Sequence, residues 1–332
     1  KLREEGRYQE AQEWINRFIE NDSSDAEAWS LLSQVLLLDN KISESQQVLL
    51  KAASINSELS SISRNHARLL LRQSKPKEAL EKAQSGYDRS SDDPESSLVL
   101  AACLAANQRD QEALSLIERA LEARSNYAEA FASRSLIRFR AKNLPKAIED
   151  AEMAVSIKPH LTQIWGLLGA LRYQSNNLSG AIKALKQAYK LEPTNPRYVS
   201  ELGEFLRQDN QVAEAIAVLR DGTKLTPEDS KIWANLGVAY QQDKNTEDAK
   251  AAYGRALDIN PKVAEVWSNL GAIAKDVKDY NSALQYFEKS VEYKPDFAEA
   301  HSNLGITLQE LGRLKEAEAS HRQAISLKPD YA

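Results

Sequence analysis

The chain has 332 residues, of which 42% are hydrophobic and 27% charged, and its formal net charge at pH 7 is -5. A general nucleic-acid-binding protein would carry a strong basic footprint, so this charge balance argues against one. The sequence contains no apolar run of about 18 residues, which argues against a membrane-spanning helix. The single cysteine, Cys103, cannot form an internal disulfide, and we expect it to be a buried apolar thiol.

The first stretch, residues 1–25, is predicted to form the second helix of a truncated helix pair. Ala11, Ile15 and Phe18 fall on one face of this helix. Because its own partner helix is missing, we expect part of this apolar face to be exposed or covered by a neighbouring molecule. The sequence also begins and ends inside its repeating pattern, which predicts a fragment of a longer chain.

From residue 26 onward the sequence repeats every 34 residues. The clearest copy is 230–263, which carries Trp233, Leu236, Gly237, Tyr240, Ala249, Tyr253, Ala256 and Pro261. This pattern resembles the tetratricopeptide repeat (TPR), with tyrosine at position 24 in place of the usual phenylalanine. The same window fits nine times without insertion, over 26–59, 60–93, 94–127, 128–161, 162–195, 196–229, 230–263, 264–297 and 298–331. Together the nine predicted repeats span 26–331.

Small residues recur where two helices would cross. Position 8 of each window is Gly, Ala or Ser, and it is glycine in five successive windows from Gly169 to Gly305. Glycine within a helix costs about 1 kcal/mol relative to alanine, so a packing gain must exceed that cost. Helical spacing predicts that positions 4, 7, 8 and 11 of the first helix face inward, as do positions 20, 24, 27 and 28 of the second.

The resemblance covers nearly the whole chain and implies an all-α fold, a right-handed α-solenoid superhelix of antiparallel helix pairs. In that family the first helices line a concave groove, mainly through positions 2, 5, 6, 9, 12 and 13. The implied function is a protein-protein interaction scaffold that binds a peptide or helix of a partner protein in this groove. We expect binding residues at these positions, because the repeats supply the scaffold and the inner face supplies specificity.

Asparagines occupy position 6 in three consecutive windows, as Asn235, Asn269 and Asn303, and again at Asn65. An asparagine amide both donates to and accepts from an extended peptide backbone. The series resembles the asparagine ladder of the O-GlcNAc transferase superhelix, which implies peptide binding. Alternatively, repeat duplication simply copied the Asn-Leu-Gly block.

A second candidate group is Arg64, Arg68 and Arg72, which the four-residue spacing places along one stripe of a helix. Like charges so placed repel one another unless an anion or an acidic partner neutralises them. The alternatives are a solvated helix face and a site for an acidic peptide.

A third group, Leu98, Val99 and Ala102, makes the groove side of the third window apolar. Such a patch suits docking of a partner side chain or helix, unless tight curvature or a missing segment covers it. Arg134, Arg138 and Arg172 occupy normally apolar positions 7 and 11, so each should pair or snorkel to the surface, with Glu149 and Asp150 as candidate partners.

The sequence offers no constellation for catalysis. None of the four histidines makes a metal-type spacing with Cys103, and no phosphate-binding glycine pattern occurs. We therefore expect no catalytic residues, no metal and no cofactor, and we expect a cytoplasmic location. The alternatives are that the repeats form the substrate-recognition arm of a larger enzyme, such as an O-GlcNAc-transferase-like glycosyltransferase, or that the chain self-associates through exposed end helices.

Overall fold

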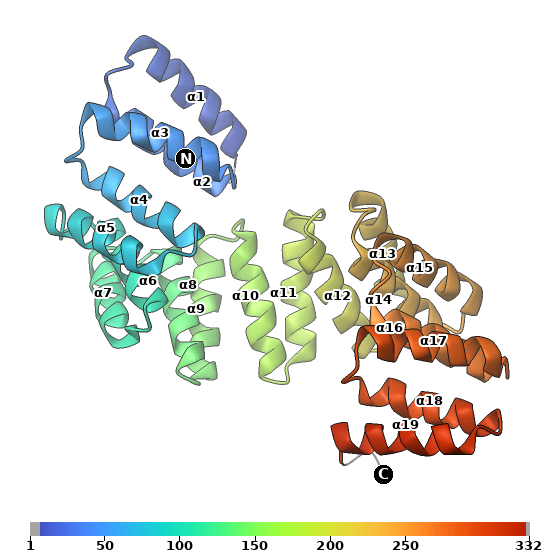
Figure 1. Ribbon diagram of the computed structural model, residues 1–332. Coiled ribbons are helices and arrows are strands. Elements are labelled where there is room, and N and C mark those ends of the chain that lie inside the picture. Colours follow the sequence, from blue (N-terminus) through green and yellow to red (C-terminus); the bar gives the residue numbers. More distant parts are fainter. Residues whose placement is uncertain (1–6, 330–332) are drawn as a thin grey trace. The chain divides into compact units, whose positions relative to one another are not determined.

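The computed structural model describes residues 7–329, and within them the chain forms nineteen α-helices (Figure 1). The expected all-α fold of consecutive helix pairs is confirmed. The helices are α1 Tyr8–Asn21, α2 Ala26–Leu38, α3 Ile42–Ile55, α4 Ser60–Arg72, α5 Pro76–Arg89, α6 Pro94–Ala106, α7 Asp110–Ala123, α8 Ala128–Arg140, α9 Leu144–Ile157, α10 Thr162–Gln174, α11 Leu178–Leu191, α12 Pro196–Gln208, α13 Val212–Leu225, α14 Ser230–Gln242, α15 Thr246–Ile259, α16 Ala264–Asp276, α17 Tyr280–Tyr293, α18 Ala298–Glu310 and α19 Leu314–Leu327.

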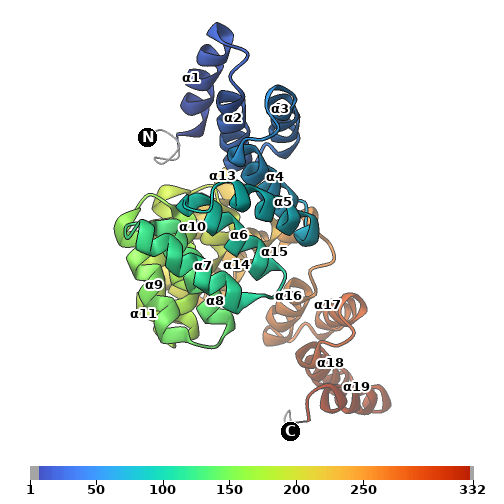
Figure 2. The same cartoon turned by 90° about the vertical axis from the view of Figure 1, so that its left-hand side faces the viewer.

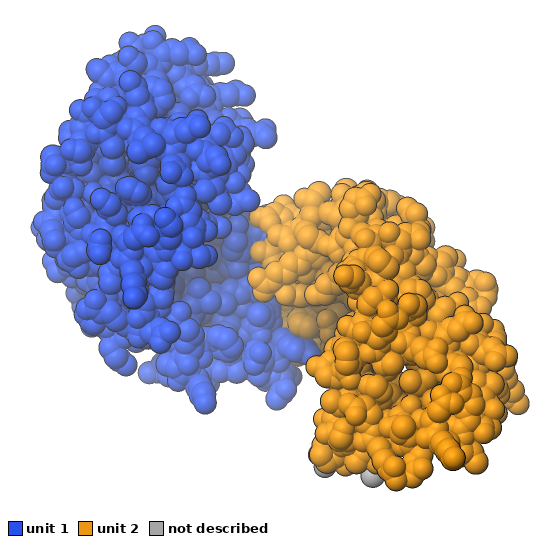
Figure 3. Space-filling view, in the orientation of Figure 1, with its two compact units in different colours: residues 1–177 blue, residues 178–332 orange. Residues whose placement is uncertain are grey.

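The chain divides into two compact units, which Figure 3 colours separately. Unit 1 comprises residues 1–177 and holds α1 to α10, whereas unit 2 comprises residues 178–332 and holds α11 to α19. Inside unit 1 the first helices α2, α4, α6 and α8 contact one another in succession, as Figure 2 also shows for α6 and α8. In unit 2, α12 contacts α14, and α16 contacts α18. The first helices from α2 to α8 therefore form one continuous row in unit 1.

A single left-handed residue ends each first helix from α2 to α18. At position 15 the backbone φ is close to +60° in Asn40, Lys142 and Lys278, and +74° in Gly312. The next amide reaches back to close the helix: Lys41 N–H donates to the Leu36 carbonyl at 2.8 Å. This geometry is a Schellman C-cap, and it turns the chain sharply into the second helix.

The glycines at position 8 let the two helices of a pair approach closely. A Cβ placed on Gly237 would lie 2.4 Å from Cε1 of Tyr253, and one on Gly271 would lie 2.7 Å from Cε1 of Phe287. Both rings, at position 24, are completely buried. A side chain at either position would collide with the ring, so the helices approach closely at this crossing, as the sequence predicted.

Positions 3 and 10 of the first helices form a second buried face that the sequence analysis did not identify. Both are buried in every first helix from α2 to α18, at Ala28, Ile62, Ser96, Ala130, Ile164, Tyr198, Ile232, Val266, Ala300 and at Val35, Leu69, Cys103, Ile137, Leu171, Phe205, Ala239, Ile273, Thr307. Val266 and Ile273 of α16 join the core formed by Ala249, Tyr253 and Ala256 of the preceding second helix, α15. These two positions thus bind each pair to the one before it.

The expected buried thiol is confirmed, since Cys103 has no exposed surface. As expected, α1 leaves apolar surface uncovered, because Trp14 and Phe18 are 64% and 53% exposed. In the described part of the chain, no helix combines the length and apolar character needed to cross a membrane.

Candidate functional site

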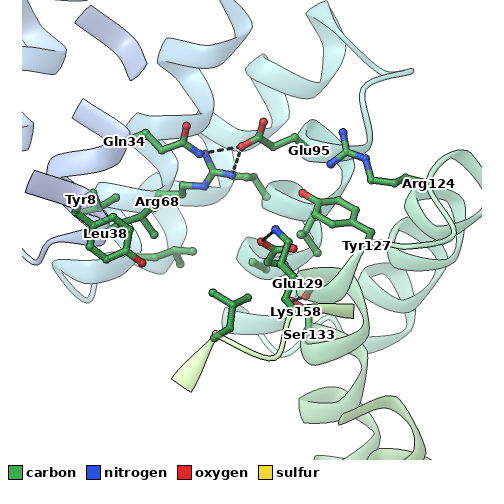
Figure 4. A pocket seen from close by; sticks show the side chains of 16 residues that line it. Tyr8, Gln34, Leu38, Arg68, Glu95, Arg124, Tyr127, Glu129, Ser133 and Lys158 are labelled. Carbon is green, nitrogen blue, oxygen red and sulfur yellow. Dashed lines mark hydrogen bonds and ion pairs between the residues drawn. The ribbon is translucent and has the colours of Figure 1, made fainter. Parts of the chain in front are cut away.

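A cavity of about 400 Å³ opens on the first-helix face of unit 1 (Figure 4). Residues as distant in sequence as Tyr8 and Leu161 line the same space, so this face of unit 1 is concave. Its apolar wall is made by Leu37, Leu38, Leu71, Leu98, Val99, Ala102, Tyr127 and Leu161. The apolar residues of α2, α4 and α6 stand at positions 5, 6, 9, 12 and 13, the positions expected to face a groove.

Arg68 and Glu95 form an ion pair on one side of the cavity. The Arg68 guanidinium donates to Glu95 Oε1 at 2.7 Å, and the Gln34 amide donates to the same oxygen at 2.9 Å. Arg68 also donates to Asn65 Oδ1 at 2.9 Å. Each of the two side chains is about one quarter exposed, so the pair is partly screened from water while still bordering the cavity.

A second ion pair, between Lys158 and Glu129, borders the cavity (Figure 4). The ammonium of Lys158 lies 2.7 Å from Glu129 Oε1. The other carboxylate oxygen, Oε2, is buried and has no hydrogen-bond donor among the described residues. A buried acceptor without a donor is costly, so Glu129 Oε2 is an unsatisfied group beside the cavity.

Tyr127 places an aromatic ring in the wall of the cavity. Its side chain is buried, and the guanidinium of Arg124 lies 4.7 Å from the ring centroid. Burial raises the pKa of the Tyr127 hydroxyl, and the nearby Glu95 carboxylate raises it further. The hydroxyl is therefore neutral at physiological pH and is available as a hydrogen-bonding group beside apolar surface.

The structure brings four of the predicted site residues together in this cavity. Arg68, Leu98, Val99 and Ala102 all line it. Arg64 lies beside it, 12% exposed, and its guanidinium pairs with Asp93 at 2.7 Å. The acidic groups of α6 and its N-cap thus neutralise Arg64 and Arg68 within the chain. Arg72 is exposed and is not among the residues that line the cavity.

Asn65 is buried and its amide is already used. It donates to the Ser30 carbonyl at 2.8 Å and to the Ser30 hydroxyl at 3.0 Å, which joins α4 to α2. Ser30 stands at position 5 of the preceding window. The position-6 asparagine of this window therefore binds the preceding first helix.

The other asparagines lie in unit 2 and are half-buried. The Asn235 amide reaches the Ser200 carbonyl at 3.5 Å, the limit of a hydrogen bond, and Asn303 Oδ1 accepts from Lys275 Nζ at 2.8 Å. Asn269 interacts with the hydroxyl of Tyr253. Close by, Arg207, Gln208, Val238, Gln241 and Gln242 line an open hollow of about 450 Å³. The first-helix face of unit 2 is thus rich in amides, whereas that of unit 1 is largely apolar.

The arginines at core positions are paired, as expected. Asp150, only 3% exposed, accepts from Arg134 at 2.8 Å and from Arg138 at 2.7 Å. Glu149 was the wrong candidate, because it points to solvent one residue away from the buried face, and Arg172 instead pairs with Glu152 at 2.8 Å. The Asp150 contacts link α8 to α9, and the Arg172–Glu152 pair links α10 to α9.

Sequence reasoning missed the residues that the inter-repeat turns contribute to the cavity. Arg124 and Lys158 stand at position 31, and Tyr127 and Leu161 at position 34. An aromatic or aliphatic residue at position 34, just before a first helix, was the available signal. Among the described residues, no group of three or more histidine, cysteine or acidic side chains could hold a metal ion.

Comparison with protein families gives one consistent result. The model described as the cytochrome c-type biogenesis protein H TPR domain matches residues 152–262, and two tetratricopeptide repeat models match residues 262–330 and residues 64–128 and 111–161. Together the matches cover most of the chain. The chain belongs to the TPR family. Its repeats support a protein-interaction scaffold, and such families are generally non-catalytic.

No curated protein matches the sequence. Among solved structures, the chain is similar to one in the crystal structure of the APC/C hetero-tetramer Cut9-Hcn1, with a TM-score of 0.61 and 17% identity over 90% of this chain. It spans 59% of the length of that chain. YrrB, described as a TPR protein with an unusual peptide-binding site, gives a TM-score of 0.49 at 20% identity, over 56% of this chain and 96% of YrrB. MamA gives a TM-score of 0.43 at 23% identity, over 49% of this chain and 95% of MamA. At these identities the likeness concerns the fold alone.

Proposed function

We propose that unit 1 binds a segment of a partner protein by taking a bulky apolar side chain into the concave cavity. The observation that carries this proposal is the cavity itself: about 400 Å³, with a wall built mainly from leucine, valine, alanine and tyrosine. Ligand-binding pockets are mostly apolar, contain a few polar groups and have volumes of roughly 300–1,000 Å³. The apolar wall would contribute affinity, because binding removes its apolar surface and that of the bound side chain from water.

The polar groups around the wall would fix the orientation of the segment. Glu129 Oε2 lacks a donor, so a main-chain N–H or a basic side chain of the segment would satisfy it. The ion pairs Arg68–Glu95 and Lys158–Glu129 border the apolar wall, and polar borders of this kind favour one register of a bound chain. In this proposal Arg64 and Arg68 stay paired with Asp93 and Glu95 and do not form an anion-binding site.

In unit 2, Asn235, Asn269 and Asn303 would contact the main chain of an extended partner segment. Their half-buried amides and the neighbouring glutamine-lined hollow support this part of the proposal. The engaged oxygen of Asn303 would exchange Lys275 for a ligand donor. Asn65, which is buried and bonded to Ser30, would instead position α4 against α2.

A peptide-library selection tests the role of the cavity. Random peptides displayed on phage are selected on the intact chain, and each enriched peptide is then measured against Ala102→Phe, in which a benzyl group would occupy the cavity. Ala102 is well suited to this change, because position 9 carries the long side chains of Gln34 and Arg68 in the two preceding windows. Gly254→Ala in unit 2, where an added Cβ meets nothing within 4 Å, serves as the control variant.

The expected result is enrichment of peptides with a bulky apolar residue whose affinity falls at least about tenfold in Ala102→Phe, equivalent to about 1.4 kcal/mol. The control should reduce the affinity for those peptides much less. Equal binding to the wild-type chain and Ala102→Phe would refute the proposal.

A further inference from the structure

Unit 2 contains a second cavity, of about 240 Å³, whose lining includes none of the position-6 asparagines. It lies between α13, α14 and α15, and its walls include Trp233, Tyr240, Ala251 and Ala252. The indole N–H of Trp233 donates to the Pro227 carbonyl at 2.9 Å, so the ring that forms one wall is held in place. The volume is below the roughly 300–1,000 Å³ of small-molecule pockets, so the cavity suits one side chain.

The next helix pair of the same unit shows what fills the equivalent space. There, Tyr286 at position 23 of the repeat lies against Trp267 at position 4, with ring centroids 5.8 Å apart. The matching pair in the preceding repeat is Trp233 and Ala252. Ala252 carries only a methyl group, so the Trp233 ring has no aromatic neighbour at this position. The cavity is therefore the space of an absent aromatic ring.

The charges around this cavity are mainly positive. Arg220, Lys224 and Arg255 line it, against a single carboxylate, Asp248, which accepts a hydrogen bond from the Asn245 amide at 2.6 Å. Arg220 is exposed, and its guanidinium makes no hydrogen bond or ion pair with any described residue. Lys224 and Arg255 form ion pairs with Asp221 and Asp258, each three residues away on exposed surface, and the Arg255 guanidinium also lies 5.9 Å from the centroid of the Trp233 ring. Exposed pairs of this kind are weak, so an incoming carboxylate competes with them readily.

We propose that this cavity is a second binding site, independent of the concave pocket, for an aromatic side chain flanked by acidic residues in a partner protein. The aromatic ring would stack on Trp233 in the position that Tyr286 takes on Trp267. The neighbouring carboxylates would contact Arg220, Lys224 and Arg255, which gives complementarity of charge as well as shape.

Nuclear magnetic resonance of the intact ¹⁵N-labelled chain tests the proposal, with the synthetic peptide acetyl-Glu-Asp-Tyr-Asp-Glu-amide as the probe. The tryptophan indole signals report the binding site directly, and Trp233→Phe assigns the relevant signal. We expect the peptide to shift the Trp233 signal with a Kd near or below about 1 mM. The same peptide with alanine in place of tyrosine should bind at least about tenfold more weakly, and added salt should weaken both.

Two variants and one control complete the test. Ala252→Tyr should fill the cavity and reduce peptide affinity at least about tenfold, as should the exposed charge reversal Arg220→Glu, which leaves the core intact. Gly254→Ala on the same helix, where an added Cβ meets nothing within 4 Å, should leave the affinity unchanged. A Trp233 signal that does not move in the wild-type chain, or peptide affinities of Ala252→Tyr and Arg220→Glu that equal that of the wild-type chain, would overturn the proposal. Neither result would bear on the concave pocket of unit 1.

Discussion

Gly237→Ala tests whether close helix packing, rather than helix propensity, sets the residue at position 8. In an open helix, replacing glycine by alanine stabilises by about 1 kcal/mol. At Gly237, however, the new Cβ would lie 2.4 Å from Cε1 and 2.5 Å from Cδ1 of Tyr253. The Tyr253 ring is fully buried, and its hydroxyl donates to Gln241 Oε1 at 2.9 Å, so it cannot move aside freely. Overpacking of this kind costs about 1–3 kcal/mol.

The two effects oppose each other, and we expect Gly237→Ala to destabilise by roughly 0–2 kcal/mol after the gain in propensity is subtracted. Gly254→Ala is the control, because its Cβ would enter open space, and it should stabilise by up to about 1 kcal/mol. Urea unfolding followed by far-UV circular dichroism measures both variants, and an unchanged m-value is needed for the comparison.

A double-mutant cycle with Tyr253→Ala isolates the contact. Once the ring is removed, Gly237→Ala should become neutral or stabilising, which gives a coupling energy of about 1–3 kcal/mol. If Gly237→Ala stabilises the chain as much as Gly254→Ala does, the packing explanation of the glycine series is wrong.

Four further predictions follow from the same contacts. Asp150→Asn should destabilise by about 3 kcal/mol, since it leaves Arg134 and Arg138 without their carboxylate, and leucine at all three positions should restore stability in urea unfolding. Leu236→Ala, at a buried core position, should cost about 2–5 kcal/mol by the same assay, and a much smaller loss would contradict its inward orientation. Lys142→Gly should raise the free energy of unfolding by up to about 1 kcal/mol in urea unfolding, because glycine adopts the left-handed backbone conformation of this position without strain. Burial raises the pKa of the Cys103 thiol to about 12, so thiol reagents at pH 8 should label the folded chain far more slowly than the urea-unfolded chain, and equal rates would contradict its burial.

Much of the fold could be predicted because the repeat signature reports the contacts inside a helix pair. Trp233, Leu236 and Gly237 on one helix meet Tyr253 on the next, and each is visible at fixed spacing in the sequence. The face made by positions 3 and 10 was harder to identify. It contains residues as different as Ile232, Ser96 and Thr307, all buried between consecutive pairs. Contact with the neighbouring pair, rather than a fixed residue type, determines that burial.

The candidate site was predictable only in part. The inward direction of Leu98, Val99 and Ala102 was implied by the resemblance, because they stand at positions that line the groove in that family, and all three line the cavity. Tyr127, Lys158 and Leu161 reach the same cavity from turns, and that convergence depends on the curvature of unit 1. Likewise, the sequence shows Arg64 and Arg68 as a cationic stripe, but Asp93 and Glu95 neutralise them only once α4 and α6 are side by side.

Photo-cross-linking of a selected peptide to the intact chain is the most direct test of the role proposed for unit 1. The apolar anchor of the peptide is replaced by photo-leucine, which keeps its size and apolar character, and the adducts are mapped by mass spectrometry. We predict adducts on the cavity wall, at Leu71, Leu98, Val99 or Leu161. Adducts confined to unit 2, or to the second helices of unit 1, would contradict the proposal that the concave cavity receives the anchor.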